Sequence, residues 1–276
     1  MDIFQATFLG ILQGLTEFLP VSSSGHLVIF KNLIGVDFSY SLFFDVLLHF
    51  GTLLAIFYIY RDTLSDLVTF LFSDSFGLVK KNGFIDTFTK DQKGRFISLI
   101  FIASIPTGII GLLYDKYFGD SFNDYRAAGI ELVITGGILL LALIAKLRKN
   151  GILGITFIDA LIIGIAQGIA IIPGISRSGL TIVAALLLGI DRKTSATFSF
   201  ILVIPAIIGA MLLESSKFIQ ASDLNFSAII SGLLFSFISG LFALKILLKF
   251  VNQGKLYYFS IYCFIVGGLV ILHSFQ

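Results

Sequence analysis

The residues that could carry chemistry in this largely apolar chain form two short clusters, and the first lies near the N-terminus. It combines an amide, a carboxylate, three consecutive hydroxyls and an imidazole, in the order Gln13, Glu17, Ser22, Ser23, Ser24 and His26. Gln13 and Glu17 are four residues apart, so on a helix both side chains point the same way. Such a group has two uses. Its oxygen atoms could hold a hard cation, or a base could activate a hydroxyl nucleophile.

The second cluster lies in the other half of the chain, where Ser176, Arg177 and Ser178 are followed one turn later by Thr181. These residues begin an apolar stretch, 180–189, that we expect to be helical. An arginine beside hydroxyls at the start of a helix offers forked donors, a positive charge and the favourable end of the helix dipole. The pattern therefore predicts a phosphate-binding site.

Both clusters also have a purely structural interpretation. Glu17 could pair with Arg177 and lock two segments together, with the serines serving only as helix caps. Arg177 could instead extend to the membrane interface. His26 could be a general base or acid, or it could simply orient the turn. Asp45 and His49, which face the same way four residues apart, are expected to support the site rather than to react.

The composition indicates that the helices that position these clusters lie in a membrane. Of the 276 residues, 57% are hydrophobic and 13% are charged, whereas a soluble domain carries about 25% charged residues. The mean hydropathy is +0.98. Glu131 and Glu214, near the ends of apolar runs, are expected to be solvated. Six runs approach the ~20 residues of a membrane-spanning helix: 41–60, 96–114, 128–145, 194–213, 227–248 and 256–274.

Two further apolar stretches, 2–35 and 154–190, are interrupted by proline, glycine and serine. Each is expected to form two short helices joined by a polar turn. Neither half is long enough to cross a membrane. Both stretches are therefore predicted to be re-entrant hairpins, each with its turn buried in protein at membrane depth.

The two hairpins match one another at a constant offset of 154 residues, although Pro20 and Pro173 miss by one position. Matching small residues in a single register indicates a duplication, with repeats over 1–150 and 151–276. Each repeat has one hairpin and three spans. Because three is odd, we predict an all-α polytopic protein with inverted repeats whose turns meet near the midplane. The matched residues are Gly10, Gln13, Gly14, Ser22, Ser24 and Gly25 with Gly164, Gln167, Gly168, Ser176, Ser178 and Gly179.

The positive charges of the loops predict the orientation. Fourteen Lys and Arg residues lie on one side of the expected spans, and four lie on the other, which are Lys31, Lys116, Arg126 and Lys217. The positive-inside rule makes the first side cytoplasmic. Both termini and the mouth of the first hairpin are then expected outside, and 61–95 is the one sizeable cytoplasmic loop.

The residues of both clusters also resemble a known family. The stretch from Gln13 to His26, QGLTEFLPVSSSGH, is similar to the first motif of the undecaprenyl-diphosphate phosphatases, the bacitracin-resistance family. The stretch from Pro173 to Thr181, PGISRSGLT, is similar to the second, and the resemblance covers essentially the whole chain. The family often has an acidic residue where this chain has Gln13, which leaves Glu17 as the principal acid.

The resemblance implies hydrolysis of undecaprenyl diphosphate, the C55 lipid carrier of peptidoglycan synthesis, in the bacterial plasma membrane with the site open to the outside. It implies a divalent cation, Mg²⁺ or else Ca²⁺, held by Glu17 and Gln13. It also implies catalytic roles for Glu17, Ser23, His26 and Arg177. The remaining hydroxyls are expected to contact the substrate: Ser22, Ser24, Ser176, Ser178 and Thr181.

The expected partners are an isoprenyl diphosphate and membrane lipid. Nucleic acid is not expected, and a homodimer is compatible with the sequence. The alternative function is a transporter or flippase of undecaprenyl phosphate, because inverted repeats with broken helices also build transporters.

Overall fold

The computed structural model describes residues 2–34, 41–117, 125–172, 174–214 and 226–275. Within these ranges the chain is helical, with short 3₁₀ and π segments and no strand. Pro173 and Lys217, named above, lie outside the described residues. The all-α class expected from the sequence is confirmed for the described part of the chain.

Six long helices correspond to the six apolar runs, and they make this a multi-pass membrane protein. Four of them, α7, α8 with its 3₁₀ extension, α11 and α12, are long and apolar enough to cross a membrane. Helix α3 meets the same test together with the helical stretch after it, across a bend of 78°, and α13 is shorter, at 17 residues. Their bounds are α3 Ser41–Ile59, α7 Gln92–Tyr117, α8 Tyr125–Leu140, α11 Arg192–Glu214, α12 Phe226–Asn252 and α13 Tyr257–His273.

The two interrupted stretches each form a pair of short helices around a turn. These helices are α1 Ile3–Phe18 and α2 Ser23–Ile34, then α9 Phe157–Ile169 and α10 Arg177–Leu187. Helix α1 begins with a capping box made by Asp2 and Gln5, and α9 begins with one made by Thr156 and Asp159. The two boxes occupy the same positions at the offset of 154 residues, and each satisfies N–H groups at the start of its helix.

Each hairpin packs against a span from the other half of the chain, α1 along α12 and α9 along α7. Gly10 and Gly164, related by the same offset, lie at these two contacts. A Cβ on Gly10 would lie 3.0 Å from the Cα of Gly232, and one on Gly164 would lie 2.8 Å from the Cα of Ala103. Only glycine permits so close a backbone approach. The reciprocal pairing is what a duplication predicts, and the division at residue 150 stays a prediction.

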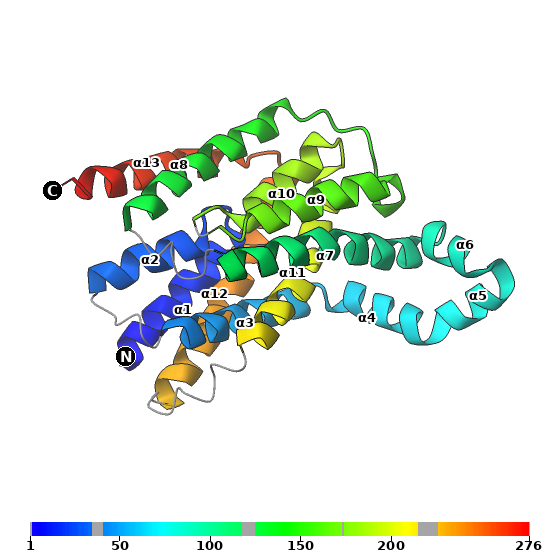
Figure 1. The fold of residues 1–276 in the computed structure, drawn as a ribbon, viewed down its shortest axis with the longest axis horizontal. Coiled ribbons are helices and arrows are strands. Elements are labelled where there is room, and N and C mark those ends of the chain that lie inside the picture. The colour runs from blue at the N-terminus through cyan, green and yellow to red at the C-terminus, as the bar shows by residue number, and fades with distance from the viewer. Residues whose placement is uncertain (1, 35–40, 118–124, 173, 215–225, 276) are drawn as a thin grey trace.

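The molecule has two distinct ends (Figure 1). Both termini lie at one end, and the segment after α3 lies at the other, where it forms α4 (Arg61–Thr69), α5 (Ser75–Asn82) and α6 (Phe84–Thr89). Lys31, counted above with the loop charges, lies in the last turn of α2. It is buried, and its Nζ is 2.6 Å from Oδ2 of Asp45.

Candidate active site

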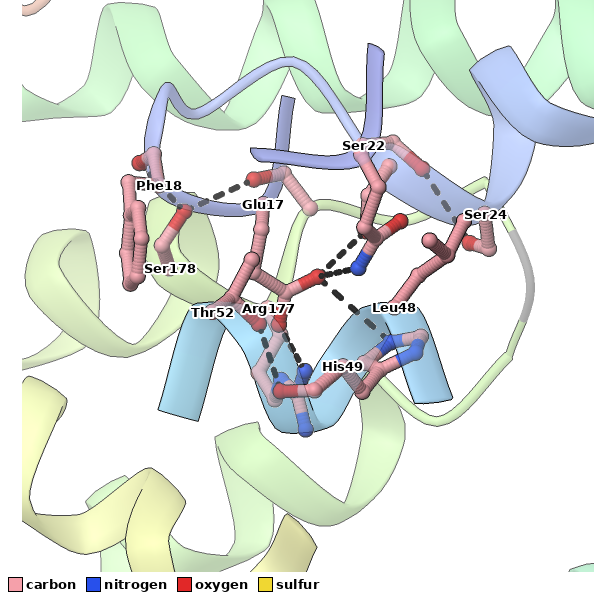
Figure 2. Close-up of polar contacts among 12 residues, drawn as sticks. Glu17, Phe18, Ser22, Ser24, Leu48, His49, Thr52, Arg177 and Ser178 are labelled. Carbon is pink, nitrogen blue, oxygen red and sulfur yellow. Dashed lines mark hydrogen bonds and ion pairs between the residues drawn. The ribbon is translucent and has the colours of Figure 1, made fainter. Parts of the chain in front are cut away.

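The turns of the two hairpins meet inside the protein (Figure 2). The Ser178 hydroxyl donates to the carbonyl of Phe18 at 3.0 Å. Arg177 forms an ion pair with Glu17, across 160 residues of chain. The two polar clusters of the sequence therefore form a single site.

Serine hydroxyls shape both turns. Ser22 Oγ accepts a hydrogen bond from the Gly25 N–H at 3.2 Å, and Ser176 Oγ accepts one from the Gly179 N–H at 3.1 Å. These bonds satisfy N–H groups in the first turns of α2 and α10. Ser22 has a φ of 67°, a left-handed conformation that residues other than glycine rarely adopt. Because α2 and α10 both begin at the site, the positive ends of two helix dipoles lie beside it and favour an anion.

The carboxylate of Glu17 is buried at the centre of the site (Figure 2). Its Oε2 accepts hydrogen bonds from Gln13 Nε2 at 2.9 Å and from Ser23 Oγ at 2.6 Å. The same oxygen lies 3.5 Å from His49 Nε2, and Oε1 pairs with Arg177. A buried charge is costly unless it is paired and hydrogen-bonded. These contacts therefore stabilise the ionised carboxylate.

A cavity of about 730 Å³ opens beside this group. Apolar walls with a few converging polar groups are typical of a ligand site. A hydroxyl that donates to a carboxylate, as at Ser23, can act as a nucleophile or hold a water that does. A guanidinium at the wall suits phosphate oxygens. The polar end of the cavity is formed by Glu17, Ser22, Ser23, Ser24, His49, Ser176 and Arg177.

His26 does not line this cavity. Its Nδ1 lies 2.8 Å from the carbonyl oxygen of Ser22, and its Nε2 lies 2.8 Å from the hydroxyl of Tyr262. A carbonyl only accepts, so Nδ1 donates, and in the neutral ring Nε2 accepts from Tyr262. Both ring nitrogens are engaged in holding the turn, so the geometry favours the orienting role for His26 over general acid or base chemistry.

Three more predicted site residues lie beside the cavity rather than in its wall. Gln13 is fully buried and contacts Glu17. Ser178 and Thr181 donate to backbone carbonyls, those of Phe18 and of Arg177 respectively. Their hydroxyls therefore position the turn and the first turn of α10. Of the predicted hydroxyl residues, those that line the cavity are Ser22, Ser23, Ser24 and Ser176.

His49 is the residue whose place the sequence did not reveal. It lines the cavity, and its Nδ1 donates to the carbonyl of Asp45 at 2.8 Å, which directs Nε2 towards Glu17. Asp45, expected to act with it, pairs instead with Lys31. The available signal in the sequence was an ionisable side chain within an apolar span, because such residues are costly in a membrane and commonly belong to functional sites.

The expectation of a solvated Glu131 was wrong. This residue lies in α8 and is 9% exposed. The turn of the second hairpin folds over it, so that a Cβ on Gly174 would lie 2.8 Å from its carboxyl carbon. Gly174 has a φ of 89°, and glycine is needed there both for that conformation and for the close approach. The side chain of Glu214 lies outside the described part.

The donor set for a metal ion is sparse. Among the described residues, no three His, Cys, Asp or Glu side chains gather where they could hold one. Glu17 supplies one carboxylate, and hydrogen-bond donors from Gln13, Ser23 and Arg177 already contact it. The amide oxygen of Gln13 is buried, and no hydrogen bond from the described residues reaches it. These two residues can offer oxygen atoms to a cation, but they fit it only if a ligand supplies most of the others.

Comparison with known proteins places the chain in a family. The family model described as bacitracin resistance protein BacA matches residues 6–269. The chain belongs to the BacA family. An undecaprenyl-diphosphatase from Alkaliphilus metalliredigens is 42% identical over 99% of both chains. One from Desulfosudis oleivorans is 43% identical over 98% of both chains, and one from Halothermothrix orenii is 42% identical over 99% of this chain and 98% of its own.

The two stretches that resemble family motifs in the sequence form the two hairpin turns. The first turn brings Glu17 and Ser23 to the cavity, and the second brings Arg177. The first motif also contains His26, which the structure keeps away from the cavity, while the next span along the chain supplies His49.

Proposed function

We propose that this protein hydrolyses undecaprenyl diphosphate to undecaprenyl phosphate and inorganic phosphate, and so recycles the lipid carrier of cell-wall synthesis. The observation that carries the proposal is the group of Glu17, Ser23 and Arg177 at the polar end of a cavity in a membrane protein. The names of the relatives agree with it. The two parts of the substrate match those of the cavity: the anionic head suits the polar end with Arg177, and the apolar tail suits the apolar walls.

The chemistry assigns a role to each of these three residues. Arg177 and the N-terminal ends of α2 and α10 bind the oxygens of the terminal phosphate and stabilise the charge that builds up there. In one route a water held by Ser23 attacks the terminal phosphorus, the bond from phosphorus to the bridging oxygen breaks, undecaprenyl phosphate leaves and inorganic phosphate is formed directly. In the other route Ser23 Oγ itself attacks, undecaprenyl phosphate leaves, and a water then hydrolyses the phosphoserine to free serine and inorganic phosphate. Glu17, 2.6 Å from Ser23 Oγ, accepts the proton of the nucleophile.

The proposal includes a divalent cation, Mg²⁺ or Ca²⁺. Glu17 and Gln13 are the residues that would hold it, together with oxygens of the bound diphosphate. When bound, such an ion neutralises charge on the phosphate groups. The partners of the protein are then the lipid diphosphate and the surrounding membrane lipid, and a homodimer stays a prediction.

Release of inorganic phosphate from purified protein in detergent tests the proposal. An enzyme releases phosphate from undecaprenyl diphosphate without a second compartment, and addition of a chelator should slow it. A transporter of undecaprenyl phosphate would bind lipid phosphate under these conditions and release none. That result would contradict the proposed hydrolysis.

We further propose that the protein lies in the bacterial plasma membrane with both termini and the mouth of the site outside. The excess of lysine and arginine at the end opposite the termini supports this orientation. A C-terminal alkaline phosphatase fusion is expected to be active, and a C-terminal green fluorescent protein fusion is expected to be dark. The reverse pattern would overturn the orientation and the outward-facing site with it.

The two histidines of the site region are expected to behave differently on substitution. His49→Ala removes a ring from the cavity wall and should lower kcat/KM by roughly 10–100-fold with little change in thermal unfolding. His49→Gln keeps a side-chain donor and should recover part of the loss. His26→Phe keeps a ring beside Tyr262 but removes the hydrogen bonds to Ser22 and Tyr262, so it should chiefly lower the unfolding temperature. Full activity in His49→Ala together with an inactive but stable His26→Phe would reverse these roles.

A further inference from the structure

The cavity extends well beyond its polar end. From Glu17 and Arg177 it continues between the later parts of α7 and α11. The walls there consist largely of small residues, which are Gly108, Gly111, Ala206, Gly209 and Ala210. Leu112 and Leu212, which also line the cavity, are 55% and 69% exposed. In a membrane protein such exposed apolar side chains face lipid, so this arm of the cavity opens to the bilayer.

The two helices that form the walls of this arm, α7 and α11, each contain one proline, which separates a packed part of the helix from a part that lines the cavity. Helices α7 and α11 contain Pro106 and Pro205 in their interiors. Before the prolines the two helices are in contact, and the rings of Phe96 and Phe198 stack with centroids 6.0 Å apart. Nearly all wall residues of α7 and α11 lie at or after the prolines. Proline removes a backbone hydrogen bond and disturbs the preceding turn, which lets the two helices pack over one half and leave space over the other.

Gly108 and Gly209 leave this arm of the cavity open. A Cβ added at either position would meet no atom within 4 Å. Other glycines of the bundle serve close helix packing, as at Gly10 and Gly164. Packing therefore does not explain Gly108 and Gly209, and what glycine provides at these positions is free space along the arm.

A buried polar atom without a hydrogen-bond partner lies in the wall of the cavity. Gln167 lines the cavity and is 1% exposed, and no hydrogen bond from the described residues reaches its amide oxygen. A buried acceptor without a donor is unfavourable. A phosphate O–H, or a water of the head group, would satisfy it. A ligand head at the polar end of the cavity would leave the apolar arm for the hydrocarbon tail attached to that head.

We propose that Gly108 and Gly209 form the passage through which the first isoprene units of the lipid diphosphate leave the site between α7 and α11. The inference rests on the proposed function. Cavities of about 300–1,000 Å³ hold drug-sized molecules, and this one measures about 730 Å³. A C55 chain is much larger, so the head and the first units occupy the cavity and the remaining chain lies in the bilayer. The two glycines are specificity determinants for the tail and do not take part in the chemistry.

Gly108→Leu and Gly209→Leu test this passage. Because a Cβ at either position meets no atom within 4 Å, we expect both variants to fold. Each leucine side chain would occupy the space of an isoprene unit. We expect KM for undecaprenyl and farnesyl diphosphate to rise by about 10-fold or more with kcat little changed. Inorganic diphosphate, which carries no isoprene unit and is used as a competitive inhibitor, should keep its inhibition constant. Gly108→Ala and Gly209→Ala should give smaller shifts of the same kind and provide a second test if a leucine variant is unstable.

The chain offers matched controls at Gly137 and Gly268. Both lie within membrane helices, α8 and α13, and neither a Cβ on Gly137 nor one on Gly268 would meet an atom within 4 Å. Neither residue lines the cavity, so their leucine variants should have the KM of the unchanged protein. Unchanged KM in the Gly108 and Gly209 variants would overturn the passage. So would an inhibition constant that rises together with KM, since the head site would then be affected. If the unchanged protein releases no phosphate, the proposed function fails instead.

Discussion

Arg177→Ala is expected to lose nearly all phosphate release, and Arg177→Lys most of it. The ion pair with Glu17 uses one nitrogen of the guanidinium, and a guanidinium carries five N–H donors in a forked arrangement that matches phosphate oxygens. Lysine supplies the charge without that geometry. Removing a donor that stabilises charge in the transition state commonly costs on the order of 10²–10³ in rate. Steady-state phosphate release from purified variants measures the loss.

The same arginine also stabilises the fold, because it neutralises a buried carboxylate. Removing one partner of a buried ion pair commonly destabilises a protein by roughly 3–5 kcal/mol, and thermal unfolding of Arg177→Ala should show such a loss. Adding Glu17→Gln removes the unpaired charge and should restore stability without restoring turnover. A double variant that regains turnover would contradict the phosphate-binding role and leave Arg177 with a structural one.

Ser23→Ala is expected to lower kcat by about 10³, because the nucleophile, or the group that holds it, is lost. Stability should change little, since the hydroxyl lies at the cavity and its hydrogen bond to Glu17 is one of several at that carboxylate. Ser23→Thr keeps the hydroxyl and should retain part of the activity. Phosphate release at saturating substrate is the measurement.

The neighbouring hydroxyl at Ser24 supplies the control. Ser24 Oγ accepts a hydrogen bond from the Gly174 N–H at 3.0 Å and so joins the two turns. Ser24→Ala should loosen this junction and reduce turnover by only about 10-fold. If Ser23→Ala and Ser24→Ala lose activity equally, the hydroxyl at position 23 has no special part in the reaction.

Much of this architecture could be predicted from the sequence, because the bilayer imposes simple rules. The apolar runs, the broken stretches and the residues at their turns are local properties, and all three correspond to helices and turns of the structure. The pairing of Glu17 with Arg177 was foreseen as an alternative to phosphate binding. The structure shows the pair and also places Arg177 at the cavity, so the two interpretations are not exclusive.

The features that escaped prediction depend on how helices rotate and pack. Whether His26 or His49 faces the cavity is decided by the orientation of α2 and α3 about their axes, which the sequence near each histidine does not determine. Lys31 lies near the end of α2, as a charge in an apolar chain often does, but its burial was not expected. Its pairing with Asp45 brings together two segments whose contact no local pattern encodes. Glu131 is covered by the turn of the second hairpin, which belongs to the other half of the chain.

The glycine contacts of the two hairpins limit how this protein can move. Alternating access requires one repeat to rock against the other around a fixed site. Here the backbone of α1 rests on α12 at Gly10 and Gly232, and that of α9 rests on α7 at Gly164 and Ala103. Each hairpin is therefore anchored to the opposite repeat, and any rocking would separate both pairs of backbones at once. These contacts argue against alternating access, which is the motion that the transporter alternative requires.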